Sequence, residues 1–218
     1  RVKEFDPSTA CNTFRIGLSD DAEFGLFPPL LARLREEAPG IIVVVRRANY
    51  LLLPSLLTSN EVSVGISYTT DLPANATRKK LRDIGVKVLR GDKRPSPLTL
   101  DEYCERGHTM VSFSGDLSGN IDLDLAKVGR TRSVVVAVPQ FSSLRALLVG
   151  TDLIATVPAY AACALVEGSD LRAEDPPFHI EPAELSMVWS GVHDNDPAER
   201  WLRSRIFEFM SQEARPIP

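Results

Sequence analysis

Short polar side chains at the ends of apolar runs are the residues of this sequence with the clearest chemical potential. In the first half of the chain they are Ser19 and Asp20 after residues 14–18, Asn49 and Tyr50 after residues 41–45, and Ser67 within residues 62–68. Hydroxyl, amide and carboxylate groups can bind a small polar molecule through hydrogen bonds. A serine followed by two acidic residues is also typical of a helix N-cap, so Ser19 has two interpretations, a ligand contact and a cap.

The second half of the chain repeats this arrangement. Its polar and aromatic residues at strand ends are Phe113, Ser114, Gln140, Phe141, Ser142 and Thr156, which end or follow the apolar runs 108–113, 133–138 and 152–158. Phe141 is either an aromatic wall of a binding site or an ordinary core residue. Tyr50 could equally lie at the surface and cover the helix that follows it.

Signatures of catalysis and of metal binding are missing from the sequence. It contains no G-x-S-x-G, H-E-x-x-H, P-loop or G-x-G-x-x-G pattern, so the enzyme classes that these motifs mark have no support. The histidines lie on different segments, and the three cysteines are too far apart for a metal site or a disulfide framework. We therefore expect no catalytic residue, no metal and no cofactor, and the cysteine pattern favours a reducing, cytoplasmic location.

Alternating strands and helices must position these polar residues. Residues 41–45 form a continuous β-branched run, which is typical of a strand buried on both faces in a parallel sheet. A helix with Pro28 and Pro29 in its first turn precedes this strand, and Pro39-Gly40 ends that helix. Right-handed crossovers in such a βαβαβ unit bring the carboxyl ends of the strands to one edge, where α/β proteins bind ligands.

A second cycle of strands and helices follows the proline-rich break at residues 95–97, and a long strand near 184–192 returns the chain to the first unit. The sequence therefore predicts an α/β protein of two Rossmann-like subdomains with a ligand cleft between them. Residues 13–90 with 190–218 form the expected first subdomain, residues 91–189 the second, and residues 1–12 a linker tail.

Composition and charge agree with a soluble, globular ligand-binding protein. The 218 residues are 44% hydrophobic and 25% charged, and the net charge is -4. This mildly acidic balance argues against nucleic-acid binding by this part of the protein alone. The basic cluster Arg78-Lys79-Lys80 with Arg82 is interpreted as a solvated strand edge. No apolar run is long enough to span a membrane, so we expect no membrane partner.

Three stretches, in order along the chain, closely resemble the effector-binding domain of LysR-type transcriptional regulators. They are Phe27-Pro28-Pro29-Leu30-Leu31-Ala32-Arg33-Leu34-Arg35 leading to Ala38-Pro39-Gly40-Ile41, the run from Leu56 to Ile66, and Thr151-Asp152-Leu153-Ile154-Ala155-Thr156-Val157-Pro158. Further motifs are similar to the NahR- and NodD-like branch of this family. They are Ser19-Asp20-Asp21, Tyr103 with Gly107-His108, Val138-Pro139-Gln140-Phe141, and Asp196-Pro197 with Trp201-Leu202-Arg203.

The resemblance implies a type 2 periplasmic-binding-protein fold and a function in transcription regulation. A small molecule, such as an aromatic acid or a flavonoid, would bind in the cleft at the strand-end residues named above and control DNA binding and transcription. DNA would be bound by an N-terminal winged helix-turn-helix that this chain lacks. The family also implies dimers through antiparallel packing of these domains, and commonly tetramers of the full-length protein.

The charge of the effector and two alternative functions stay open. Asp20 and Asp21 would repel an anionic effector unless an arginine offsets them. Gln140 stands where some members of the branch carry histidine, and this departure counts against a salicylate-type effector. The alternative binding function is an extracytoplasmic solute-binding protein of a transporter, which shares the fold. The enzyme alternative is a catalytic member of the fold such as porphobilinogen deaminase, which would need a catalytic constellation.

Overall fold

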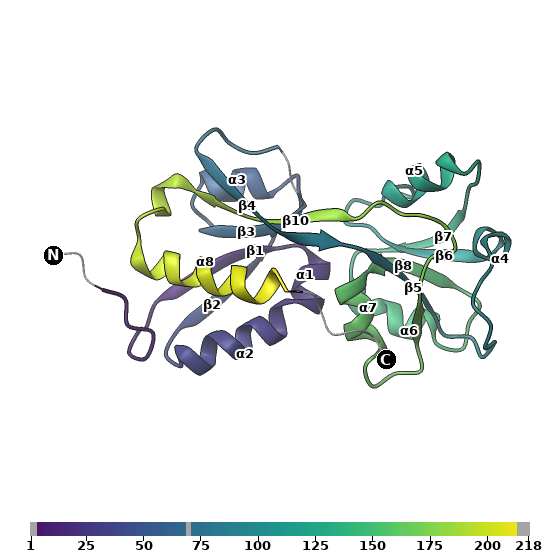
Figure 1. Cartoon of the computed structure of the whole chain (residues 1–218), viewed down its shortest axis with the longest axis horizontal. Helices are drawn as coiled ribbons and strands as arrows, with labels where there is room; N and C mark the ends of the chain where they lie inside the picture. Colours follow the sequence, from purple (N-terminus) through teal and green to yellow (C-terminus); the bar gives the residue numbers. More distant parts are fainter. Residues whose placement is uncertain (1–3, 69–70, 213–218) are drawn as a thin grey trace. The chain divides into compact units, whose positions relative to one another are not determined.

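The computed structural model of the chain describes residues 4–68 and 71–212, which divide into two compact units (Figure 1). Residues 4–83 and 183–212 belong to the first unit, and residues 84–182 form the second. Each unit is built on its own five-stranded sheet. This arrangement confirms the predicted α/β class with two sheets.

The sheet of the first unit is parallel on one side and mixed on the other. Its strands are β1 (Thr13–Leu18), β2 (Ile42–Arg47), β3 (Val64–Ser67), β4 (Ala76–Ile84) and β10 (Ala183–Ser190), in the order β2-β1-β3-β10-β4. β1 pairs in parallel with β2 and β3, whereas β10 is antiparallel to β3. The prediction that the β-branched run is buried on both faces was wrong, because β2 is the edge strand and Ile42 is 57% exposed.

Helices cover both faces of this first sheet. They are α1 (Asp20–Gly25), α2 (Phe27–Glu37), α3 (Leu53–Thr58) and α8 (Pro197–Met210), and a short 3-10 turn, η2 (Gly191–His193), precedes α8. α2 and α8 lie side by side on one face, and α3 lies on the other (Figure 1). The alternation of β1 agrees with this, since Ile16 and Leu18 are fully buried while Gly17 faces Leu53 of α3.

The N-terminus of α8 is fixed by a capping side chain and a proline. Asp196 is its N-cap, and its side chain accepts hydrogen bonds from the backbone N–H groups of Ala198 (2.9 Å) and Glu199 (3.5 Å). Pro197 occupies the first helical position, where a missing N–H costs nothing. Leu202 and Ile206 are fully buried against the sheet, so the apolar stripe of this helix anchors it to the first unit.

The sheet of the second unit, like that of the first, contains three parallel strands and further strands that pair in the antiparallel direction. Its strands are β5 (Val86–Arg90), β6 (Gly107–Val111), β7 (Ser133–Val138), β8 (Ile154–Pro158) and β9 (Arg172–Glu174), in the order β7-β6-β8-β5-β9. β6 runs parallel to β7 and β8, and β5 runs antiparallel to β8 and β9. The helical elements are α4 (Leu100–Glu105), α5 (Asn120–Lys127), the 3-10 turn η1 (Phe141–Ser143), α6 (Leu144–Leu148) and α7 (Ala159–Val166).

The chain passes between the units earlier than the sequence analysis expects. Residues 86–90, placed there in the first subdomain, form β5 of the second sheet, and residues 183–189, placed there in the second, lie in β10 of the first. The expected boundary relied on the prolines at 95–97. Only Gly85 separates β4 from β5, so the actual crossing has almost no loop to mark it in the sequence.

The proline-rich segment after β5 is held by a buried ion-pair network. The Arg90 side chain is 1% exposed and donates to both oxygens of Asp92, at 2.9 and 2.8 Å. It also donates to Glu174 (2.9 Å) and to the backbone carbonyl of Ser96 (2.7 Å). Arg106 also donates a hydrogen bond to Asp92. The pKa of Asp92 lies far below its usual range, mainly because of the hydrogen bond from Arg90.

Candidate functional site

Three parallel strands of the first unit end at the same level of the sheet. Leu18 of β1 is aligned with Arg47 of β2 and with Ile66 of β3. The residues that follow each of them therefore lie along one edge, and the Ala48 N–H donates to the Leu18 carbonyl at 2.8 Å. The strand-end residues Ser19, Asn49 and Ser67 lie along or just beyond this edge, as sequence reasoning placed them.

Ser19 occupies the N-cap position of α1 without capping the helix through its side chain. Its backbone is extended, with φ -68 and ψ 161, and its carbonyl accepts from the Glu23 N–H at 2.9 Å. The hydroxyl oxygen makes no cap hydrogen bond, is buried, and has no hydrogen-bond partner within residues 4–68 and 71–212. A buried hydroxyl without a partner costs about 1–3 kcal/mol, which a bound ligand could recover.

A second serine at this edge was not singled out from the sequence. Ser186 of β10 lies directly opposite Ser67 of β3 in the antiparallel register. The Ser186 side chain is buried, and its hydroxyl also lacks a hydrogen-bond partner in the described part of the chain. The available signal was a lone hydroxyl in the otherwise apolar stretch from Leu185 to Val188.

Asp20 pairs with an arginine that sequence reasoning did not consider. The Arg47 guanidinium lies 3.2 Å from the Asp20 carboxylate, whose side chain is only 19% exposed. This is the offsetting arginine that an anionic ligand would require. Asp20 is therefore expected to repel an anionic ligand at this edge much less than it would without Arg47.

The other predicted contact residues of the first unit differ in how accessible they are to a ligand. The Asn49 side-chain oxygen accepts from the N–H groups of Leu51 and Leu52, both at 2.9 Å, so it holds the turn that leads into α3. Only its NH2 group is left for a ligand. Tyr50 is 61% exposed and stands at the surface, while Ser67 is buried in β3.

The parallel strands of the second unit also end together. Val111 of β6 is aligned with Val138 of β7, and the Ser112 N–H donates to the Val138 carbonyl at 2.9 Å. This edge gathers four of the predicted residues. They are Phe113, 49% exposed, Ser114, whose hydroxyl donates to Asp116 at 3.0 Å, and the exposed Gln140 and Ser142.

Two predicted residues of the second unit are directed into its interior. Phe141 opens η1 and is only 7% exposed. The Thr156 hydroxyl lies 2.6 Å from the Tyr103 hydroxyl, with either group able to donate. Tyr103 is fully buried in the cluster that includes Leu125 and Ile154, and burial raises the pKa of its phenol. Thr156 therefore already has a polar partner inside the second unit.

A buried histidine and an ion pair support this interior. The His108 ring lies 2.6 Å through Nε2 from the Tyr103 carbonyl, so Nε2 carries the proton, and Nδ1 is buried without a partner among the described residues. Burial lowers the pKa of His108 to about 4. Asp122 accepts from Arg132 and from the Gly119 N–H, and it lies in the first turn of α5. No group of three or more potential metal ligands occurs among the described residues.

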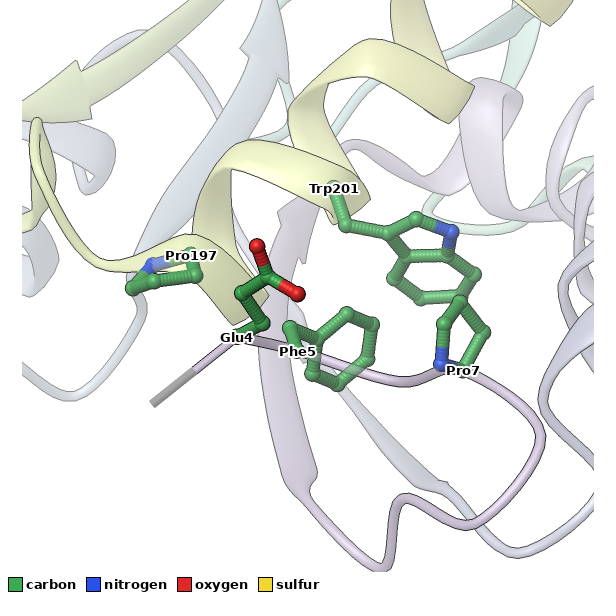
Figure 2. Close-up of a pocket in the computed structure, with 5 residues that line it drawn as sticks. All are labelled: Glu4, Phe5, Pro7, Pro197 and Trp201. Atoms are coloured by element: carbon green, nitrogen blue, oxygen red, sulfur yellow. The ribbon is translucent and has the colours of Figure 1, made fainter. Parts of the chain in front are cut away.

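The segment before β1 packs on the first unit, against β1 and α8. The Phe5 ring lies 5.1 Å from Trp201 of α8 and 6.4 Å from Phe14 of β1, measured between ring centroids. Figure 2 shows the neighbouring hollow of about 500 Å³, which is lined by Glu4, Phe5, Pro7, Pro197 and Trp201. None of the predicted strand-end residues lines it.

Comparisons with known proteins agree with this architecture. The model of the LysR substrate binding domain family matches residues 8–211. The transcriptional activator NahR of Pseudomonas putida is 28% identical over 212 residues, which cover 96% of this chain and 71% of NahR. Nodulation protein D 3 of Rhizobium leguminosarum bv. phaseoli is 31% identical over 227 residues, covering 99% of this chain and 71% of that protein. The crystal structure of the regulatory domain of MexT from Pseudomonas aeruginosa is 66% identical, with a TM-score of 0.86, covering 90% of this chain and 99% of that one.

The two-sheet α/β architecture and these matches define a ligand-sensing domain of the type 2 periplasmic-binding fold. More specifically, the chain belongs to the LysR family and is the effector-binding domain of a LysR-type transcriptional regulator. The comparisons give no support to the alternative of a transporter's solute-binding protein. No helix in the described part of the chain is long and apolar enough to cross a membrane.

Proposed function

We propose that the effector is bound by the predicted strand-end residues, with Ser19 as the principal contact in the first unit. The observation that carries this proposal is the Ser19 hydroxyl, which is buried, unpartnered among the described residues and not used as a helix cap. Ser186 would add a second hydroxyl at the same edge. From the second unit, the proposal includes Phe113, Ser114, Gln140 and Ser142, which follow its parallel strands β6 and β7.

The chemistry of the first edge favours a hydrogen-bonding effector with a polar end. Two hydroxyls and the Asn49 NH2 group offer donors, and the hydroxyls can also accept. Arg47 offsets the charge of Asp20, so this carboxylate alone does not decide between an aromatic acid and a flavonoid-like phenol. We expect binding without turnover, because the relatives of this chain are transcriptional regulators.

The same proposal includes self-association and a link to DNA. Each sheet has a free edge strand with exposed apolar residues: Ile42 of β2 is 57% exposed, and Val135 of β7 is 58% exposed. Exposed apolar edges of this kind are surfaces for pairing with another chain. In homodimers, and in tetramers of the full regulator, two or four effector domains would be joined to DNA-binding modules of the same cytoplasmic assembly. An effector shifts such an assembly only by binding one of its states better than another.

A thermal-shift screen tests the assignment. Aromatic acids, flavonoids and amino-acid-like compounds are added to the purified domain, and at least one is expected to raise the melting temperature in a saturable way. Ser19→Trp should abolish that shift while leaving the unliganded melting temperature close to that of the wild type. Ser55→Trp, an exposed change on α3, is the matched control and should keep the shift. An effector response that survives Ser19→Trp would overturn the proposal.

A further inference from the structure

The basic cluster Arg78-Lys79-Lys80 is divided between the two faces of β4. The Arg78 guanidinium lies 2.5 Å from Glu184, and the Lys80 ammonium lies 3.0 Å from Asp83. Lys79 instead extends over the Phe207 ring of α8, with its ammonium 3.8 Å from the ring centroid. The cluster is therefore only partly the solvated strand edge that its sequence suggests, because its middle residue faces a groove.

This groove lies between α8 and the strands β4 and β10, and its volume is about 270 Å³. Strand alternation places Met187 and Trp189 on the same face of β10, and helical spacing places Arg200, Arg203 and Phe207 on one side of α8. With Lys79, these residues give the groove two aromatic rings, a thioether and three cationic groups.

The floor of the groove is fixed by internal contacts. The Arg203 guanidinium lies 4.8 Å from the Trp189 ring centroid, and it donates to the carbonyls of His193 (3.1 Å) and Asp194 (3.2 Å). The Trp189 indole N–H donates to the Asp194 carboxylate at 2.6 Å. Arg203 and Trp189 therefore form a rigid wall that presents a flat apolar face next to a buried positive charge.

The rim of the groove carries excess positive charge. Lys79 and Arg200 are exposed, and neither forms an ion pair with another residue in the described part of the chain. The carboxylates that act on this region are Asp194, at the indole N–H, Glu199, which is itself partly buried, and Asp196, the N-cap of α8. The two rim cations are thus left to attract an anion from solution.

We propose that this groove is a second ligand site, separate from the strand-end site, that takes a small organic anion with one flat apolar ring, such as an aryl carboxylate. The ring would lie against Trp189, Phe207 and Met187, and the carboxylate would face Lys79 and Arg200. Charge-assisted hydrogen bonds from two cations and ring contacts with two aromatic side chains are complementary to this class of molecule. The inference rests on the groove alone and does not depend on the proposed effector contacts.

The two tryptophans of the chain make this site directly observable. In protein labelled with 5-fluorotryptophan, fluorine NMR gives one signal for Trp189 in the groove and one for Trp201, which packs against Phe5. Trp201→Phe assigns the two signals. Titration with phenylacetate should move the Trp189 signal in a saturable way and leave the Trp201 signal in place. Phenylacetamide, which has the same ring and no charge, should bind at least tenfold more weakly.

Matched variants decide whether the groove is responsible. Lys79→Gln with Arg200→Gln should weaken phenylacetate binding at least tenfold, whereas Lys80→Gln, which changes the neighbouring lysine, should leave it unchanged. Ser19→Trp should also leave it unchanged. The proposal is overturned if the Trp189 shift rises linearly without saturation, if it persists in the Lys79 and Arg200 double variant, or if it disappears in Ser19→Trp.

Discussion

The Arg47 guanidinium lies 3.2 Å from the Asp20 carboxylate, which joins the end of β2 to the start of α1. This contact sits beside Ser19 and sets the electrostatic character of the candidate effector site. The positive charge of Arg47 offsets the negative charge of Asp20 in this pair. Anionic and neutral effectors therefore both remain compatible with the first unit.

The Asp20–Arg47 pair should have a measurable but small coupling energy. Arg47 is 39% exposed, so solvent screening limits the interaction to about 0.5–1 kcal/mol. Urea unfolding of Arg47→Gln, Asp20→Asn and the double variant forms a double-mutant cycle that isolates this coupling. A coupling energy indistinguishable from zero would show that the pair does not hold in solution and that Arg47 does not offset the charge of Asp20.

His108 should make the domain less stable in mild acid. Because burial lowers its pKa from 6.5 to about 4, His108 stays neutral in the folded protein while the unfolded chain takes up a proton below pH 6.5. The stabilising effect is complete above pH 6.5 and is lost as the pH falls towards 4. The total loss is roughly 3 kcal/mol.

Urea unfolding at pH 7, 5.5 and 4.5 measures this loss. His108→Leu should lower stability at pH 7, because the Tyr103 carbonyl loses its partner, yet it should flatten the decline over this pH range. A variant whose stability falls as steeply as that of the wild type would contradict the assignment. The depressed pKa of Asp92 acts at lower pH and should not obscure the comparison.

Much of the fold was predictable because the local preferences of these segments for helix or strand agree with their tertiary packing. The strand-helix alternation and the prolines at the start of α2 encode local structure and are found as expected. The edge position of β2 was not predictable, since a β-branched run is equally compatible with central and edge strands. The β4–β5 crossing was missed because only Gly85 separates the two strands.

The candidate site was predictable only in part. Strand ends could be located from the sequence, which placed Ser19 and Ser67 at one edge. Side-chain partners depend on contacts between distant segments, so the Arg47 pair with Asp20 and the Tyr103 hydrogen bond to Thr156 were not foreseeable. Ser186 was missed for the same reason, since its place opposite Ser67 is set by pairing between residues far apart in the chain.

Arg90 should be among the most sensitive residues of the second unit. Arg90→Met removes the buried cation that pairs with Asp92 and Glu174, and it should cost about 3–5 kcal/mol of unfolding free energy because both carboxylates lose a partner. Arg94→Met is the control, since Arg94 is 60% exposed in its pair with Glu102 and should cost less than about 1 kcal/mol. Equal costs for the two variants, measured by urea unfolding, would show that the buried network does not anchor this segment.

Tyr103 and Thr156 should act as a stability pair. Tyr103→Phe and Thr156→Val should each destabilise the domain by about 0.5–1.5 kcal/mol, and the double variant should cost less than the sum. If Thr156 instead serves mainly as an effector contact, Thr156→Val would reduce effector affinity while Tyr103→Phe would leave it unchanged. Unfolding and binding measurements on the same set of variants separate the two roles.

The proposed effector site is tested most directly by mapping a compound found in the screen onto the domain by NMR. Backbone amide shifts should change in a saturable way at Ser19, Asn49 and Ser67 in the first unit, and around Ser114 and Gln140 in the second. Ser19→Trp should remove these changes, and Ser55→Trp should preserve them. Saturable shifts confined to β4, β10 and α8, with none at the strand ends, would contradict the account and place effector recognition in the groove instead.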